Sequence, residues 1–305
     1  MAKVYENTWW GSICDVTNNW GKIYKSLANC FNSKAVQFDG VSPGESISIF
    51  DLPFQFLENE GMLIMAWVKL DPALKTFNNY GQRCIVDYSS SITSTANGKG
   101  YSIYVRKTTT TLTINWFYKR AGFSRTQCNI DIDLNQFDFS KPMLVVASLY
   151  PDNVGGVSST VQDLRVWQNG VNANNYVDGT QKVLQVVGTA FPASQNVCLG
   201  ATNDTGTASA ELAGIIDEIV FYSGNASIGE DYRQLSDDYF RGNGGEPQLD
   251  LTKIPYYNAI VGWYRMGDNL TITSPFTFPN ASGGSGASGI GDSDFSADQI
   301  VSSII

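Results

Sequence analysis

Thr111-Leu-Thr-Ile-Asn-Trp-Phe-Tyr118 is the stretch that decides the fold class. Apolar and polar residues alternate along it, and the side chains of a β-strand point to opposite faces in turn. One face of the strand therefore carries Leu112, Ile114, Trp116 and Tyr118. The preceding run repeats the pattern with Tyr101, Ile103 and Val105. A period of two in neighbouring runs predicts half-buried β-strands.

Similar short runs follow one another from about residue 35, separated by Gly, Asn, Asp and Ser. They lie at 35–39, 46–50, 62–70, 83–88, 101–106, 111–118, 143–150, 164–168, 183–187, 196–200 and 214–222. Many short strands with turn residues between them predict an all-β fold, a jelly-roll β-sandwich of two antiparallel sheets.

One short helix is predicted near 227–241. Ser227-Ile-Gly-Glu230 forms a capping box, and apolar residues recur after it at helical spacing. We expect the sandwich to span 35–241 and an N-terminal arm or wrapping segment to span 1–34. Residues 242–280 would add one strand and an extension that packs on the sandwich. Residues 281–305 begin with nine small residues and predict a Gly/Ser linker with a C-terminal arm, either disordered or docked on a neighbour.

The composition excludes several classes of function. The chain has 305 residues, 20 Lys+Arg against 29 Asp+Glu, a net charge of −9 and no histidine. Nucleic-acid binding needs clustered cations, so an acidic chain argues against it. The absence of histidine removes Ser-His-Asp and Cys-His catalysis and His-ligated zinc. The cysteines form no Cys-x-x-Cys pair that would suggest zinc or redox chemistry, and we expect them to be small apolar fillers.

The sequence also predicts a compartment. The N-terminal residues contain no apolar run after a basic start, so we expect no secretory signal peptide. No stretch approaches 18 consecutive apolar residues, so we expect no membrane-spanning helix and no membrane partner. The chain would be made in a cytoplasm and would act elsewhere if an assembly carries it out.

Five short motifs occur in a fixed order. They are Ala35-Val-Gln-Phe-Asp-Gly40, Met62-Leu-Ile-Met-Ala-Trp-Val-Lys69, Val166-Trp-Gln-Asn-Gly170, Cys198-Leu-Gly200 and Ala213-Gly-Ile-Ile-Asp-Glu-Ile-Val-Phe-Tyr222. In order and spacing they resemble the concanavalin A-like lectin/glucanase superfamily in its laminin-G-like form. The resemblance covers about 35–241 and implies a concanavalin A-like sandwich.

A sixth motif, Trp263-Tyr-Arg-Met-Gly-Asp268, resembles a segment of laminin-G-like structural proteins in tailed, especially marine, bacteriophages. This second resemblance implies that the chain is a component of a virion.

The glucanases of the superfamily use a Glu-x-Asp-x-x-Glu strand whose carboxylates share one face, as retaining hydrolysis requires. That spacing is missing here. Asp131 and Asp133 form the nearest acidic pair, two residues apart and without a glutamate. We therefore expect no enzymatic activity.

The resemblance also implies a structural calcium site. In laminin-G-like domains an aspartate near the first turn and one in the "DE" pair commonly help to hold the ion, and the matching residues here are Asp39 and Asp217. Backbone carbonyls would complete the oxygen shell. The alternative is that Asp39 caps its own turn and Asp217 accepts backbone N–H groups.

Aromatic residues provide the candidates for carbohydrate binding. Trp67, Trp116 and Trp167 lie inside predicted strands, where we expect them in the core. Tyr80, Phe123 and Tyr176 lie in loop-like segments and are the better candidates for stacking on a sugar ring.

The expected function is therefore a non-enzymatic virion structural protein of a tailed phage, either a capsid decoration or a fibre or adsorption component. It would join other virion proteins through its terminal arms, as a homo-oligomer or multi-copy assembly. The alternative is a calcium-assisted lectin module that attaches to host glycans. A third hypothesis, a glycoside hydrolase, lacks the required carboxylate spacing.

Overall fold

The structure is a computed structural model. It describes residues 34–40, 46–49, 52, 61–76, 80–89, 100–119, 126–154, 157–168, 176–177, 182–184, 197–202, 210–223, 260–266, 277–278, 280–281, 289–291 and 300–302. The helix expected near 227–241 and almost all of the segment 1–34 lie outside these residues.

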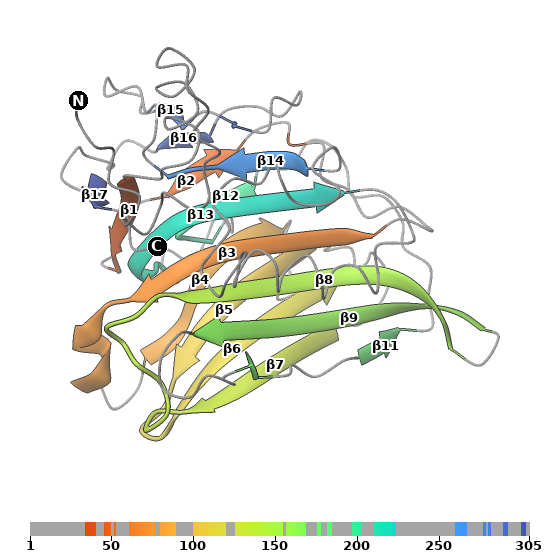
Figure 1. Cartoon of the computed structure of the whole chain (residues 1–305), viewed down its shortest axis with the longest axis horizontal. Helices are drawn as coiled ribbons and strands as arrows, with labels where there is room; N and C mark the ends of the chain where they lie inside the picture. The colour runs from red at the N-terminus through yellow and green to blue at the C-terminus, as the bar shows by residue number, and fades with distance from the viewer. Residues whose placement is uncertain are drawn as a thin grey trace, which may run out of the picture.

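The described strands form two sheets that stack face to face (Figure 1). The first sheet has the order β10 (Tyr176–Val177), β9 (Val157–Gln168), β8 (Met143–Val154), β3 (Met62–Leu70), β13 (Ala213–Ser223), β1 (Lys34–Asp39) and β17 (Ile300–Ser302). In addition, β11 (Lys182–Leu184) pairs with β9, and β14 (Ile260–Tyr264) pairs with β13.

The second sheet lies behind the first in Figure 1. Its order is β15 (Thr277–Phe278), β16 (Gly289–Gly291), β2 (Ile47–Ile49), β12 (Val197–Leu199), β4 (Tyr80–Ser89), β5 (Gly100–Lys107), β6 (Thr111–Lys119) and β7 (Thr126–Asp133). A 3-10 helix, η1 (Pro72–Thr76), lies between β3 and β4 in the chain order. The predicted all-β sandwich of two antiparallel sheets is confirmed. Within the described ranges, no helix is long and apolar enough to cross a bilayer.

The core between the sheets explains the alternation in the sequence. The alternating residues of β6 belong to the main apolar cluster, as predicted: Leu112, Ile114, Trp116 and Tyr118. The cysteines that the structure describes, Cys84, Cys128 and Cys198, are buried free thiols. They fill space in the strands, as expected.

A second apolar cluster covers the outer face of the first sheet. Its members come from β3, β8, β9, β13 and β14 and include Trp67, Trp167, Val220, Tyr222 and Trp263. Central strands of this sheet are therefore buried on both faces, which explains why β3 reads Met-Leu-Ile-Met-Ala-Trp-Val-Lys-Leu without alternation. Trp67, Trp116 and Trp167 are all buried, as predicted, but in two different clusters.

The motifs of the first resemblance contact one another in the fold. Gly200 has φ +79°, and a Cβ there would lie 2.2 Å from the ring of Phe38. Gly40 has φ +74°, and its Cβ would lie 2.7 Å from that of Ala213. Both β1 and β3 pair with β13. Both positions favour glycine, because the backbone has a positive φ there and because a neighbouring residue lies too close for a Cβ. These neighbours, Phe38 for Gly200 and Ala213 for Gly40, belong to other motifs of the resemblance.

Parts of the C-terminal segment belong to the sandwich. β16 pairs with β2 in the second sheet, and β17 pairs with β1 in the first. Over 281–305 the sequence predicted a Gly/Ser linker and a C-terminal arm, either disordered or docked on a neighbour, whereas these two strands pair within the chain. These strands are only three residues long, too short to show a period, and they are held by pairing with strands distant in sequence.

Candidate functional site

Asp39 and Asp217, the expected calcium ligands, lie apart. Asp39 is exposed at the end of β1 and pairs with Ala213, whereas Asp217 is fully buried four residues further along β13. At about 3.3 Å per residue the two positions are separated by about 13 Å along the strand. A calcium ion binds oxygens at about 2.3–2.6 Å, so one ion does not fit both carboxylates. The described residues also contain no cluster of three or more metal-ligating side chains of the His, Cys, Asp and Glu types.

A β-bulge interrupts β13 at Asp217. Strict alternation would place it with Ile215 and Ile219, but the β13–β3 register shifts between Ile216 and Ile219. Ile216 and Ile219 both point into the main core, although they are three residues apart. Asp217 lies at this bulge, where an extra residue interrupts strict alternation of the side chains.

Of the three carbohydrate candidates, Tyr80 is the one whose side chain the structure describes. Tyr80 is buried at the start of β4, and its hydroxyl accepts a hydrogen bond from the Ala213 N–H at 2.8 Å. Burial raises the pKa of the Tyr80 hydroxyl. The Arg83 guanidinium lies 4.8 Å from the centroid of the Tyr80 ring. This buried ring is therefore not free to stack on a sugar. Tyr80 thus lies at a buried position of β4, whereas the sequence placed it in a loop-like segment. The backbone of Tyr176 pairs with Trp167, and Phe123 lies outside the described residues.

Asp131 and Asp133 each have a structural partner. The Thr113 hydroxyl donates to Asp131 at 2.7 Å across the β6–β7 pair. Asp133 ends β7 and accepts hydrogen bonds from the Asn135 backbone N–H at 2.9 Å and its side-chain amide at 3.0 Å. The two exposed carboxylates hold a strand pair and a turn.

A buried polar cluster joins β13 to β14. Glu218 accepts a hydrogen bond from the Trp263 indole N–H at 3.3 Å and from the Arg265 Nε at 3.2 Å. The Arg265 guanidinium also lies 5.4 Å from the Trp263 ring centroid. Glu218 belongs to the "DE" motif, and Trp263 and Arg265 belong to the phage-like motif. The motifs of the two resemblances thus form one structural unit.

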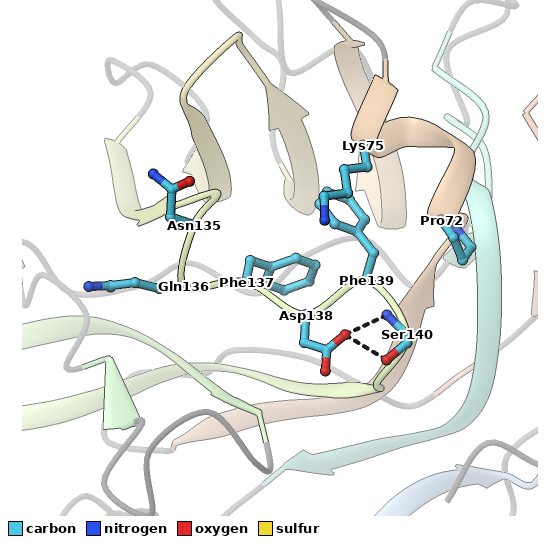
Figure 2. A pocket seen from close by; sticks show the side chains of 8 residues that line it. All are labelled: Pro72, Lys75, Asn135, Gln136, Phe137, Asp138, Phe139 and Ser140. Atoms are coloured by element: carbon cyan, nitrogen blue, oxygen red, sulfur yellow. Dashed lines mark hydrogen bonds between the residues drawn. The ribbon is translucent and has the colours of Figure 1, made fainter.

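A pocket of about 410 Å³ opens at one end of the sandwich, between η1 and the β7–β8 loop (residues 134–142). We call it the η1 pocket, and it is lined by Pro72, Lys75, Asn135, Gln136, Phe137, Asp138, Phe139 and Ser140. Figure 2 shows Lys75 reaching from η1 toward Phe139, with Asn135 and Gln136 on the other side of Phe137. The pocket thus combines a cation, amides, a carboxylate and a hydroxyl above aromatic rings.

Hydrogen bonds fix the backbone of the β7–β8 loop. Gln168 of β9 accepts from the Asp138 backbone N–H at 2.9 Å and donates to the carbonyls of Asp138 and Lys141 at 2.8 and 3.2 Å. The Asp133 carbonyl accepts from the N–H groups of Gln136 and Phe137. The loop is therefore held from β7 at one end and from β9 in its middle.

Asp138 carries the negative charge of the pocket. Its Oδ1 accepts from the Ser140 hydroxyl at 2.6 Å and from the Ser140 N–H at 2.9 Å (Figure 2). These bonds, followed by the Lys141 and Lys75 charges, lower the pKa of Asp138 below its ordinary value. The carboxylate is ionised at neutral pH, and its Oδ2 lies 3.9 Å from the Lys141 ammonium.

Phe137 and Phe139 form the floor. Their ring centroids are 4.8 Å apart at an interplanar angle of 83°, an edge-to-face contact, and both rings belong to the main core. This pocket could not be predicted from the sequence, because its two sides come from residues 72–75 and 135–140. The available signal was Asp133-x-Asn135 followed by Asp138-x-Ser140, which is typical of successive Asx turns.

Comparisons with known proteins give structural similarity only. No protein-family model matches the chain, and no curated protein matches it. The chain is similar to the enzymatically active domain of tailspike protein 2 of bacteriophage CBA120, with a TM-score of 0.45 and 8% identity, covering 77% of this chain and 30% of that one. It is also similar to the botulinum neurotoxin serotype C1 binding domain, with a TM-score of 0.35 and 12% identity, covering 69% and 53%. Both scores are below 0.5, and neither similarity assigns a function to this chain.

Proposed function

We propose that this chain is a non-enzymatic structural protein in the virion of a tailed bacteriophage, where a laminin-G-like sandwich forms a capsid decoration or a fibre or adsorption component. The supporting observation is the contact of Glu218 with Trp263 and Arg265. It makes the phage-like motif an integral part of the first sheet, beside the motif that carries the laminin-G-like resemblance.

The roles of the carboxylates also support a scaffold. Glu218 and Asp163 are buried against arginines, and Asp131 and Asp133 hold a strand pair and a turn. Charged groups used in this way fix the geometry of strands and loops. A carboxylate with a paired structural partner is poorly suited to proton transfer, which needs a group that is free to reach a substrate.

The net charge of −9 suits a protein that must stay dispersed until it meets its assembly, because like charges oppose association. Since β16 and β17 belong to the sheets, we assign the attachment role to the N-terminal segment 1–34 rather than to the whole of 281–305. Several copies joined through such segments would bind an assembly by multivalency.

The test is quantitative mass spectrometry of particles purified from the phage or prophage that carries the gene. We expect the chain in the particles. A copy number comparable to that of the major capsid protein would indicate decoration, and a much lower one would indicate a fibre, neck or tail component. Complete absence from intact particles would overturn the proposal. A chain lacking residues 1–33, supplied in place of the full chain, should fold but fail to be incorporated.

A further inference from the structure

We propose that β7, the terminal strand of the second sheet, pairs antiparallel with β7 of a second copy of this chain. The two copies are related by a two-fold axis through Ile130, and their second sheets join into one continuous sheet. This contact goes beyond the virion role, because it concerns how copies of the chain bind each other, and it does not depend on that role.

The length of β7 sets it apart from the other edge strands. β7 lies at the lower margin of the second sheet in Figure 1, and β6 is its one strand neighbour in the part of the chain that the structure describes. It has eight residues, whereas the other described strands with a single strand neighbour have two to five: β10, β11, β14, β15 and β17. Proteins commonly keep edge strands short, because the outward N–H and C=O groups of an edge bind further strands. β7 therefore offers the longest described edge for strand addition.

This edge is also regular and held in place. The β6–β7 register runs over eight residue pairs without a shift, and β7 contains no proline, glycine or lysine, which are residues that blunt an edge. The Cys128 thiol donates to the Gln162 carbonyl at 3.3 Å, and the Gln162 side-chain amide donates to the Trp116 carbonyl at 3.0 Å. These bonds connect β6 and β7 to β9 of the first sheet. Little further order is therefore needed when a second strand binds, which lowers the entropic cost of association.

The alternation of side chains along β7 restricts the register of the pairing. The inward residues belong to the main core: Cys128, Ile130 and Ile132. The outward residues are exposed: Gln127, Asn129, Asp131 and Asp133. A partner strand must oppose inward residues with inward ones, because a slip by one residue exchanges the two faces of a strand. In a pairing of two identical antiparallel strands, the axis must therefore pass through a residue and not between two residues.

The outward polar residues favour an axis at Ile130. This axis places Gln127 opposite Asp133 of the second copy, and Asn129 opposite Asp131 of the second copy. Each carboxylate then faces a side-chain amide that donates to it, and no two carboxylates meet. In contrast, an axis one outward residue further along would bring together Asp131 of both copies, and like charges directly opposite each other are destabilising.

The carboxylates have acceptor atoms for these contacts. In the described part of the chain, Asp131 accepts from Thr113 through Oδ1, and Asp133 accepts from Asn135 through Oδ1. Oδ2 of each carboxylate therefore remains as an acceptor for the opposing amide.

The inward residues match as well. With the axis at Ile130, this residue meets its own copy, and the other two inward residues of β7, Cys128 and Ile132, meet each other. The apolar core of each sandwich thus continues across the contact, which removes more apolar surface from water.

The test is sedimentation velocity of the full chain over a wide range of concentrations. We expect a reversible equilibrium of monomer and dimer that stops at two copies, because a two-fold contact uses the same surface of both. Asn129→Lys places an ammonium opposite Asp131 of the second copy, twice per dimer, and should lower the dissociation constant roughly 2- to 30-fold. Asn129→Asp opposes carboxylates at the same two places and should raise the dissociation constant by a similar factor.

The matched controls are Gln82→Lys and Gln82→Glu. They make the same changes of charge at an exposed position of β4, which is an interior strand of the same sheet, and should leave the dissociation constant nearly unchanged. Amide hydrogen exchange gives a second measurement. Exchange over residues 126–133 should slow as the concentration rises, whereas exchange in β14, another strand with a single described neighbour, should not change.

Three results would overturn the assignment. The first is a chain that stays monomeric at every concentration. The second is a dimer whose formation does not slow exchange over residues 126–133. The third is a dimer that Asn129→Lys weakens, since an axis at Asn129 would oppose two lysines. Because both measurements use isolated protein, their outcome is separate from whether the chain is found in particles.

Discussion

The carboxylate of Glu218 and the guanidinium of Arg265 face each other across β13 and β14, with Oε1 and Nε 3.2 Å apart. Their side chains are 0% and 6% exposed. Ile219 pairs with Tyr264, so the neighbouring residues come opposite each other by strand register. The ion pair therefore holds β14 against β13, a central strand of the first sheet.

Removal of one partner should be costly. We expect Arg265→Met to lower the free energy of unfolding by about 3–5 kcal/mol, because the Glu218 charge would stay buried without its cation. The double variant Glu218→Gln/Arg265→Met should be less destabilised than Arg265→Met alone. Urea denaturation of the four chains in a double-mutant cycle measures the coupling.

Lys141→Met provides the control, because the Lys141–Asp138 pair is separated by 3.9 Å and its side chains are 40% and 31% exposed. Such surface pairs contribute about 0–1 kcal/mol. A loss below about 1 kcal/mol for Arg265→Met as well would show that the buried pair does not stabilise the sheet.

Gly200 gives a second prediction. Gly200→Ala should destabilise the chain by about 2–4 kcal/mol, because a side chain at positive φ is strained and its Cβ would overlap the Phe38 ring. Gly81→Ala is the matched control, since a Cβ there meets nothing within 4 Å, and it should change stability by less than about 0.5 kcal/mol. Equal thermal melting of the two variants would contradict the close packing of Phe38 on Gly200.

The chain should lose stability in alkali. Burial raises the pKa of Tyr88 to about 12 from 10.0, and it also raises the pKa of Tyr101, which stacks on Tyr88 at 5.1 Å. Between pH 10 and 12 the unfolded chain releases the Tyr88 proton and the folded chain retains it, so unfolding becomes more favourable. A shift of two pKa units corresponds to about 3 kcal/mol, present in full below pH 10 and lost as the pH rises toward 12.

Denaturation at a series of pH values from 8 to 12 measures this loss. Tyr88→Phe, which cannot ionise, should show a shallower decline over the same interval. If the two pH profiles have the same slope, Tyr88 is not the group that titrates.

The sequence predicted the sandwich where burial leaves a pattern. β6 alternates because one of its faces is buried, and β3 is continuously apolar because both of its faces are buried. β16 and β17 have no such pattern, because a three-residue strand is specified by its neighbours and not by its own composition.

The positions of the candidate site residues could be predicted less well than the strands of the sandwich. The bulge at Asp217 shifts side chains by one position, and nothing in the local sequence marks it. Tyr80 lies in a loop-like stretch of sequence, but it is buried, and its hydroxyl accepts a hydrogen bond from the N–H of Ala213, more than a hundred residues away in sequence. The η1 pocket likewise needs the tertiary fold, which brings Lys75 to the β7–β8 loop.

The C-terminal strands give a fourth prediction. A chain ending at residue 280 loses β16 and β17, which exposes an edge of β1 and removes a partner of β2, so its melting temperature should fall by several degrees or more. A chain ending at Ser302 keeps every described strand pair and should melt like the full chain. If the chain ending at 280 also melts like the full chain, β16 and β17 do not stabilise the sandwich.

The pairing of β17 with β1 also has a consequence for biosynthesis. These strands are neighbours in space, but about 260 residues separate them along the chain. At a translation rate of about 5–20 residues per second, β1 leaves the ribosome tens of seconds before its outer partner. During that interval its unpaired edge can pair with strands of other chains. The first sheet is thus completed only after residues 300–302 have left the ribosome, and ribosomes that stall before them would release chains whose β1 edge is unpaired.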